Sequence, residues 1–219
     1  MGIYAPKDFG EIDKSQYGLT ELPCLEKAGL IWVTIDPKST LDIKLFLSGY
    51  DELLAHFGFE KWHHFASQVV EGPNWKIAYD GYLDLYHLPI LHKDTFGSDF
   101  PNQAIYYSWG PHQRVAGPMK GMAKMLGDSE EDWPTEYLTA GVWTIFPHIS
   151  IAGFDGGGRA VMLSQLFPGE TPGTSYTVQH YLMAEEPKDE AAVKAARDQL
   201  DFLRYVVAEE DYATGLKQQ

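Results

Sequence analysis

The chain has 219 residues, of which 44% are hydrophobic and 14% aromatic, which is enough apolar material for one substantial core. Its 17 basic residues stand against 31 acidic ones, and the net charge of −14 argues against binding to nucleic acids or anionic membranes. Cys24 is the only cysteine, so the chain alone can form neither a disulfide nor a cysteine-ligated iron–sulfur site. The sequence shows no signal peptide and no apolar run of membrane-spanning length, so we expect a reducing, cytoplasmic setting.

The first third of the chain predicts an irregular start followed by strands and one helix. Residues 1–22 are punctuated by glycines and a proline, which is typical of irregular structure. The apolar run Gly29–Ile35 ends at an Asp-Pro pair and predicts a buried strand. Residues 40–57 carry a mixed apolar pattern that indicates a helix, and Phe65–Val70 is a second predicted strand, closed by a Gly-Pro pair.

The remainder predicts a sheet closed by a long helix. Residues 74–92 form a helical, aromatic-rich stretch that interrupts the β pattern. Further strands are expected over 103–109, 114–119, 140–146, 159–167 and 174–183. Residues 187–216 have the apolar period of a long amphipathic helix.

Antiparallel strands followed by one long helix predict an α+β fold, in which a curved antiparallel sheet grips the C-terminal helix. Such a fold would resemble the helix-grip arrangement of START and Bet v1-like domains. It would leave a small-molecule cavity between sheet and helix, with a solid core as the alternative.

The most informative stretch lies between Asn74 and His92, where two histidines and two carboxylates occur in an otherwise apolar segment. Buried polar groups need partners, and a metal ion is one such partner. Asp84 and His87 are three residues apart, so the carboxylate can accept a hydrogen bond from the ring nitrogen that a metal leaves free. His87 and His92 are five residues apart with Pro89 between them, so a distorted helix would allow them to converge without requiring it. On spacing alone, histidines bonded to backbone carbonyls are the more common arrangement.

A third ligand is expected on the C-terminal helix. Its apolar positions recur at helical spacing and define a buried stripe of Val193, Ala196, Leu200, Leu203, Val206 and Val207. Extending the stripe places Glu210 near its middle, Asp211 near its edge and Glu209 outside it. Periodicity slightly favours Glu210 but does not decide, and fraying of the helix end would leave both carboxylates in water. Two histidines and one carboxylate form the ligand set of non-haem Fe(II) oxygen-activating enzymes, although zinc could use the same ligands for hydrolysis.

These residues resemble a known family. Trp75-Lys76, Asp80–His87 and His92 are similar to the iron-binding signature of Rieske oxygenase large subunits. That signature runs Trp-Lys, an acidic-Asn pair, an acidic residue, Tyr-His and a second His after four residues. Other similar segments are Tyr17–Leu19, Leu22-Pro23, Gly29–Val33, Phe146–His148 and Glu210-Asp211 with Gln218.

The resemblance implies the catalytic domain of a ring-hydroxylating alpha subunit. Residues 1–38 would be the remnant or linker after a missing Rieske cluster domain, and residues 39–219 the mononuclear-iron catalytic domain. His87, His92 and Asp211 would bind Fe(II), which settles the choice between the two carboxylates by resemblance alone. Asp84 would be the catalytic carboxylate that passes electrons from the [2Fe-2S] Rieske cluster of a neighbouring subunit. The cluster itself is expected only from a missing domain or a partner, because the Cys-His pairs that ligate it are absent from this sequence.

The expected activity is hydroxylation of an apolar, aromatic substrate with O₂, as in aromatic hydrocarbon catabolism. Electrons would come from a ferredoxin and reductase or a separate Rieske protein, and the assembly would be a homotrimer or a hexamer. Gly81 and His148 stand where the family has asparagine, and losing the first would alter access of water or O₂. Two alternatives stay open: an inactive module that binds a hydrophobic ligand, and a zinc hydrolase on the same ligands.

Overall fold

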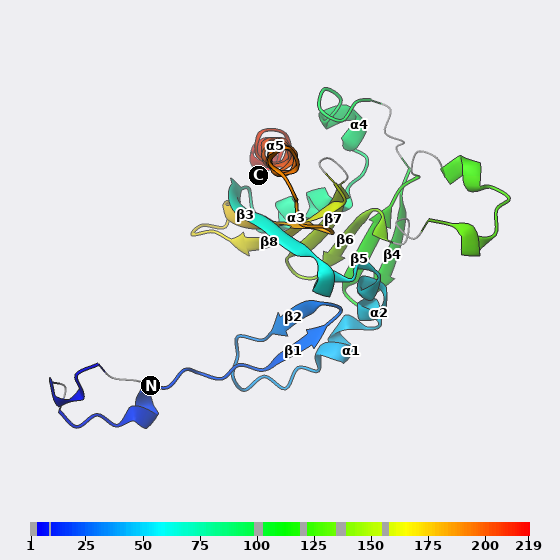
Figure 1. Cartoon of the computed structure of the whole chain (residues 1–219). Coiled ribbons are helices and arrows are strands. Elements are labelled where there is room, and N and C mark those ends of the chain that lie inside the picture. Colours follow the sequence, from blue (N-terminus) through cyan, green and yellow to red (C-terminus); the bar gives the residue numbers. More distant parts are fainter. Residues whose placement is uncertain (1–3, 9, 99–102, 119–121, 135–138, 155–157) are drawn as a thin grey trace.

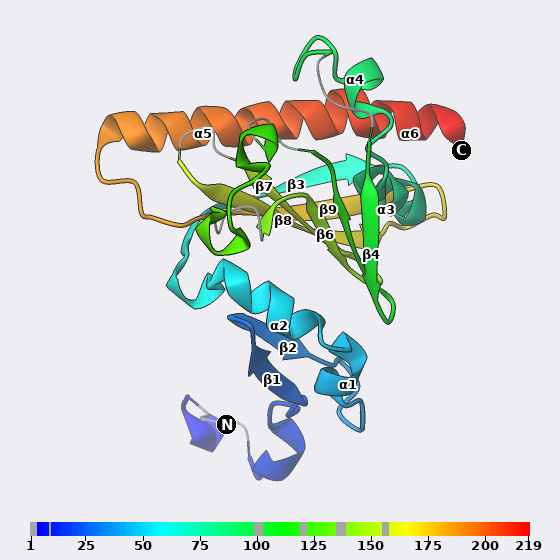
Figure 2. The same cartoon turned by 90° about the vertical axis from the view of Figure 1, so that its right-hand side faces the viewer.

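The computed structural model describes residues 4–8, 10–98, 103–118, 122–134, 139–154 and 158–219. Its centre is a seven-stranded antiparallel sheet with the strand order β3-β9-β8-β7-β6-β5-β4. The strands are β3 (His63–Gly72), β4 (Ile105–Trp109), β5 (His112–Ala116), β6 (Val142–Ile145), β7 (Ile149–Phe154), β8 (Ala160–Pro168) and β9 (Ser175–Met183). The C-terminal helix crosses one face of this sheet, and the N-terminal elements lie on the other side (Figures 1 and 2). The predicted α+β, helix-grip fold is therefore confirmed.

The strand predictions missed β7. Its sequence, Ile149–Phe154, contains a serine and a glycine, and it is separated from β6 by one short turn. β7 is paired on both sides, with β6 and with β8, so neighbouring strands stabilise it despite its weak local pattern. The strand expected over 114–119 is β5, which begins at His112 and ends at Ala116, whereas residue 119 lies outside the described residues.

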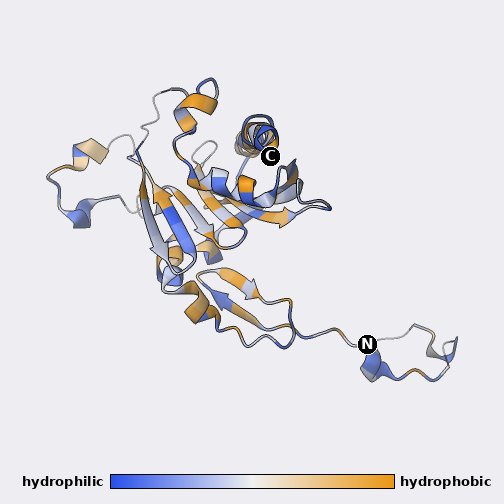
Figure 3. Cartoon of the chain, turned by 180° about the vertical axis from the view of Figure 1, so that it is seen from behind, coloured by the Kyte–Doolittle hydropathy of each residue, from blue (hydrophilic) through white to orange (hydrophobic). Residues whose placement is uncertain are grey.

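β1 (Cys24–Lys27) and β2 (Leu30–Val33) form a separate two-stranded hairpin. The predicted buried strand at Gly29–Ile35 is wrong, because Ile31 and Val33 are 76% and 51% exposed. Only the alternate side chains, Leu30 and Trp32, pack against the domain core. A hairpin on the surface of a domain has one covered face, which explains the alternation. Hydrophobic residues on this hairpin are visible in Figure 3.

The single helix expected over 40–57 is divided in two. α1 (Ile43–Leu47) and α2 (Tyr50–Leu54) are separated by Ser48 and Gly49, whose φ angles are 53° and 85°. A left-handed backbone ends a helix, so the chain turns here. Tyr50 and its neighbours pack on Trp143, on the sheet face opposite the C-terminal helix. Short 3-10 helices occur at Pro6–Asp8, Lys14–Tyr17, Ala55–Phe57, Phe59–Lys61, Met122–Met125 and Glu130–Asp132.

Two short helices lie within the predicted helical stretch 74–92. α3 (Trp75–Leu83) begins at Asn74, whose side chain accepts a hydrogen bond from the Lys76 N–H at 2.9 Å. α4 (Leu88–Leu91) follows after a non-helical break. The break precedes Pro89, which lies in the first turn of α4, where a helix does not need the missing N–H.

The C-terminal helix is one rod with a change of winding. α5 (Glu190–Tyr205) continues as a π-helix, η8 (Val206–Tyr212), and then as α6 (Ala213–Gln218). The predicted buried stripe is confirmed at Ala196, Leu200, Leu203 and Val206, which are at most 4% exposed. Val193 is 44% exposed, so its predicted burial is wrong, because it precedes the segment that packs on the sheet. None of the described helices is both long and apolar enough to cross a membrane.

Candidate metal centre

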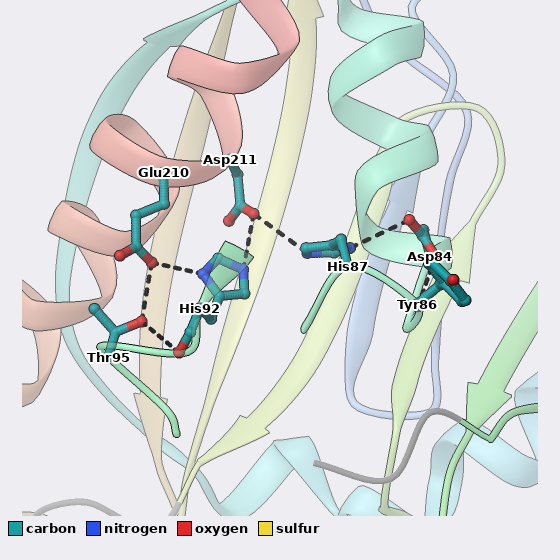
Figure 4. A network of polar contacts seen from close by, with 7 residues as sticks. All are labelled: Asp84, Tyr86, His87, His92, Thr95, Glu210 and Asp211. Atoms are coloured by element: carbon teal, nitrogen blue, oxygen red, sulfur yellow. Dashed lines mark hydrogen bonds and ion pairs between the residues drawn. The ribbon is translucent and has the colours of Figure 1, made fainter. Parts of the chain in front are cut away.

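Three side chains with metal-binding atoms converge between α4 and the C-terminal helix. They are His87, His92 and Asp211. Each offers one ligand atom, and the three atoms lie within 4.8 Å of one another. The Asp211 Oδ1 atom is 3.0 Å from His92 Nε2 and 3.4 Å from His87 Nε2. Figure 4 shows both rings directed at this carboxylate. Atoms bound side by side to a metal at about 2.1 Å are about 3 Å apart, so the spacing fits a single ion.

The two histidines lie close together because α4, which separates them, is short. His87 is its N-cap residue and His92 its C-cap residue, so the helix between them is a single turn. An ideal helix would direct positions five apart to different sides, but His87 follows the non-helical break after α3. The two ring centroids are 5.0 Å apart, and the ring planes are inclined by 68°.

The π-helix η8 brings both adjacent carboxylates to His92. Glu210 Oε2 lies 2.6 Å from His92 Nδ1, and Asp211 Oδ1 lies at the opposite ring nitrogen. A π-helix has a wider turn than an α-helix and frequently occurs at functional sites. Periodicity left open which of the two carboxylates faces the core, and in the structure both contact the His92 imidazole, from different sides.

Each histidine has a carboxylate on its outer nitrogen. Asp84 Oδ2 lies 3.4 Å from His87 Nδ1, as the three-residue spacing predicts, and Glu210 has the same relation to His92. The Thr95 hydroxyl donates to Glu210 Oε2 at 3.0 Å and so helps to hold this carboxylate. The sequence contained a signal for Glu210, through the buried stripe, but none for its role. It gave no signal for Thr95.

Burial and charge act in opposite directions at this site. Burial lowers the pKa of His92, but hydrogen bonds with Asp211 and Glu210 outweigh it, so the pKa is raised. Burial raises the pKa of Asp211, but hydrogen bonds with His87 and His92 outweigh it, so this pKa is lowered. The site thus favours a positive charge next to the Nε2 atoms, and it favours the ionised form of the Asp211 carboxylate. Both effects suit a bound cation.

The two departures from the family signature lie outside this triad. A side chain at Gly81 would meet nothing within 4 Å, so packing does not require glycine there. His148 lies in the turn between β6 and β7, and its ring packs against Phe167. A surface hollow is formed by residues Glu185–Lys188, at the opposite end of the C-terminal helix from Asp211. The cavity expected beneath the helix stays a prediction.

Comparison with known proteins agrees with the fold and identifies the family. The family model described as ring hydroxylating alpha subunit (catalytic domain) matches residues 59–219. No curated protein sequence matches the chain.

Among solved structures, the chain is similar to the quaternary ammonium Rieske monooxygenase CntA. It matches the complex with an inhibitor at 17% identity and a TM-score of 0.74, and the complex with the substrate L-carnitine at 17% and 0.71. A third structure, described in terms of carnitine oxidation and inter-subunit electron transfer, matches at 19% and 0.71. All of this chain is covered, but it spans only 56% to 57% of those chains. Because the family model covers well over half of its residues, the chain belongs to the family of ring-hydroxylating alpha-subunit catalytic domains.

Proposed function

We propose that His87, His92 and Asp211 bind Fe(II) and that oxygenation of an organic substrate takes place beside them. The observation that carries this proposal is the meeting of two imidazole Nε2 atoms and one carboxylate oxygen within 4.8 Å. Two histidines and a carboxylate with open positions suit Fe(II) that activates O₂. When bound, the iron would supply the redox chemistry of O₂ activation.

The surrounding residues would prepare both rings for this role. If each Nδ1–H donates to its carboxylate, Asp84 for His87 and Glu210 for His92, each Nε2 presents its lone pair to the metal. Asp211 then supplies the negative charge on the inner side. The two outer carboxylates would therefore hold the protons on the Nδ1 atoms and leave the Nε2 atoms free to bind the metal.

Asp84 would also connect the site to an electron source. Its side chain is half-exposed while it contacts His87, so it can reach both the site and a partner surface. The proposal takes the electrons from a [2Fe-2S] Rieske cluster in a neighbouring subunit of a homotrimer or hexamer, or in a separate Rieske protein supplied by a ferredoxin and reductase. The inter-subunit electron transfer described for a similar structure, that of a quaternary ammonium Rieske monooxygenase, is a precedent on the same fold.

The substrate class is a separate matter from the oxygenation itself. An apolar, aromatic substrate stays a prediction from the family resemblance. The similar structure with the substrate L-carnitine indicates that proteins of this fold also accept substrates that are not aromatic.

Metal analysis of the chain and its variants tests the proposal. The parent is expected to bind about one Fe(II) per chain. His87→Ala and Asp211→Ala should weaken binding by at least about 100-fold, because each removes a direct ligand, a larger loss than for an outer partner. His64→Ala is a matched control, since His64 is exposed on β3.

Unchanged iron affinity in both ligand variants would contradict the assignment. Activity is tested by supplying a reductase and a cluster protein, or peroxide, with candidate substrates. Product formation would reject the reading as an inactive binding module. Hydrolysis supported by zinc and not by iron would replace the oxygenase proposal with a zinc hydrolase.

A further inference from the structure

Two histidines meet on the face of the sheet that points away from the C-terminal helix, which we call the outer face. His64 of β3 lies opposite Leu182, and His180 of β9 lies opposite Ser67. Opposed residues point to the same face of a sheet. Leu182 packs against the core cluster around Trp143, which belongs to the outer face. Both histidines and the serine therefore share this face, on the other side of the sheet from the candidate metal centre.

A β-bulge in β3, an edge strand of the sheet, turns His64 to the outer face (Figure 1). The pairing of β3 with β9 shifts between His64 and Ala66, so that Phe65 is an extra residue. In a regular strand, residues three apart point to opposite faces, and His64 would point away from Ser67. Because of the bulge, Phe65 and Ala66 both pack against the cluster that includes α5, and His64 joins Ser67. Bulges at sheet edges re-aim side chains in this way and are over-represented next to active sites.

Both imidazoles point at one atom. The Ser67 Oγ atom lies 2.8 Å from His64 Nε2 and 2.7 Å from His180 Nδ1. The two ring centroids are 5.9 Å apart, and the ring planes are inclined by 54°. His64 and Ser67 are exposed and His180 is half-buried, so the group is accessible from solvent. A rotation of the exposed His64 side chain would bring both nitrogens to a single ion, at the distance of about 2.1 Å that a metal requires.

Gln165 of β8 fixes the tautomer of His180. Its Oε1 atom lies 3.2 Å from His180 Nε2, and an amide oxygen accepts hydrogen bonds but cannot donate them. His180 therefore carries its proton on Nε2 and directs the lone pair of Nδ1 toward Ser67. Burial lowers the pKa of His180, and the charge of the neighbouring His64 lowers it further, so the ring is neutral at neutral pH. Metals bind the neutral form, and histidines that bind them almost always donate the other ring N–H to a fixed acceptor.

We propose that His64, Ser67 and His180 form a second metal site, for a divalent cation that prefers nitrogen ligands, such as Zn²⁺. Two imidazoles would bind the ion directly, and the serine hydroxyl and water would take the remaining positions. These ligands include no carboxylate, so they do not suit Mg²⁺ or Ca²⁺, which require oxygen ligands. Fe(II) binds nitrogen ligands more weakly than Zn²⁺, so the candidate metal centre, which adds a carboxylate, stays the proposed iron site.

Calorimetric titration with Zn²⁺ tests this proposal. The parent chain should bind one Zn²⁺ ion at this site, in addition to any ion at the candidate metal centre. His64→Ala and His180→Ala should each weaken binding here by at least about 10-fold, because each removes a direct ligand. His56→Ala is the matched control, since His56 is another exposed histidine, and it should leave binding unchanged.

NMR of the histidine side chains identifies the ligand atoms in the parent chain, and so does not depend on the folding of a variant. Zn²⁺ should shift the resonances of His64 Nε2 and His180 Nδ1 and leave those of His56 in place. Binding of Zn²⁺ that shifts neither ring, or that both substitutions leave unchanged, would overturn the proposal. A parent chain that binds Zn²⁺ only at the candidate metal centre would also overturn it.

The second site and the proposed iron site can fail separately. His64→Ala should lose Zn²⁺ from the second site and keep Fe(II) at the candidate metal centre, whereas His87→Ala should do the reverse. A chain that binds no Fe(II) but holds Zn²⁺ between His64 and His180 would contradict the proposed function and support the second site. A chain that binds Fe(II) but shows no Zn²⁺ effect at these two rings would support the proposed function and overturn the second site.

Discussion

At the scale of single residues, the candidate metal centre depends on which atom of each side chain faces the position of the proposed ion. His92 is 1% exposed and has a carboxylate at each ring nitrogen, so its orientation is fixed from both sides. Asp84 supports His87 in the same way but more weakly, because its Oδ2 atom lies 3.4 Å from His87 Nδ1 and its side chain is half-exposed. A ring held in this way loses little freedom when a metal binds.

Glu210→Gln tests this support. The amide cannot reproduce the charge that stabilises the His92 ring, so iron affinity should fall by about 10-fold to 100-fold. Isothermal titration of the metal-free protein measures the change. Glu209→Gln is the matched control, since Glu209 is adjacent in sequence and exposed. Equal affinities for the two variants would show that Glu210 does not position the ring.

His112 predicts a pH dependence of stability. Its Nε2–H donates to the Phe46 carbonyl at 2.9 Å, and its Nδ1 accepts the Phe146 N–H at 3.2 Å, so the folded protein holds the neutral ring. Burial lowers its pKa, with the bond to Phe46 opposing. At a pH below 6.5, the ordinary pKa of histidine, His112 binds a proton in the unfolded chain but not in the folded chain. The free energy of unfolding therefore decreases as the pH falls.

Urea unfolding of the parent and of His112→Asn between pH 7 and pH 5 measures this effect. The parent should lose up to about 1.4 kcal/mol more per pH unit than the variant, the value for one proton. Parallel pH profiles would contradict the prediction. His92 acts in the opposite sense, because its raised pKa gives stability that is present at low pH and lost as pH rises. Since the parent and His112→Asn both contain His92, its contribution cancels in the comparison.

At the scale of elements, the π-helix η8 and the one-turn helix α4 place the ligands. Tyr212, at the end of η8, is buried and its hydroxyl lies 2.5 Å from the Thr177 hydroxyl. Gly72, at the end of β3, lies directly against the Tyr212 ring. The position of Asp211 therefore depends on how closely this strand end approaches the helix.

Gly72→Ala should disturb this contact. A methyl group there would collide with the Tyr212 ring, so we expect a loss of about 1–3 kcal/mol in the free energy of unfolding, together with weaker iron binding. Gly81→Ala is the matched control, because its methyl group would meet nothing within 4 Å. It should be stabilising by roughly 0.5–1 kcal/mol, as for other helical glycines. Chemical denaturation and metal titration of both variants check the prediction, and similar behaviour of the two would contradict it.

At the scale of the whole molecule, the proposed ion joins α4 to the C-terminal helix and so links two segments distant in sequence. A ligand that binds only the folded state stabilises it, by about 2.7 kcal/mol at a concentration 100 times its Kd. Fe(II) should therefore raise the thermal midpoint of the parent. Asp211→Asn, which keeps the shape of the side chain, should abolish the increase. A similar increase in the variant would place the ion elsewhere.

The sequence predicted the family and most of the elements, because these depend on local patterns. The helical period of residues 187–216, the strand Phe65–Val70 and the Asp84–His87 spacing all have causes within a few residues of each other. The buried strand at Gly29–Ile35 was mistaken, because an apolar run does not reveal whether one or both of its faces will be covered. β7 was missed because pairing with two neighbours supports it more than its own residues do.

By itself the sequence determined the kinds of groups available: two imidazoles around a short helix, adjacent carboxylates near the chain end and hydroxyls spread over separate strands. Only the tertiary structure decided how they meet. The π-helix turned Glu210 and Asp211 to opposite nitrogens of one ring, which an α-helical period of 3.6 residues could not anticipate. Strand register set residues as far apart in the sequence as Gln68 and Gln179 directly opposite each other, and register is set by pairing and packing across the whole sheet.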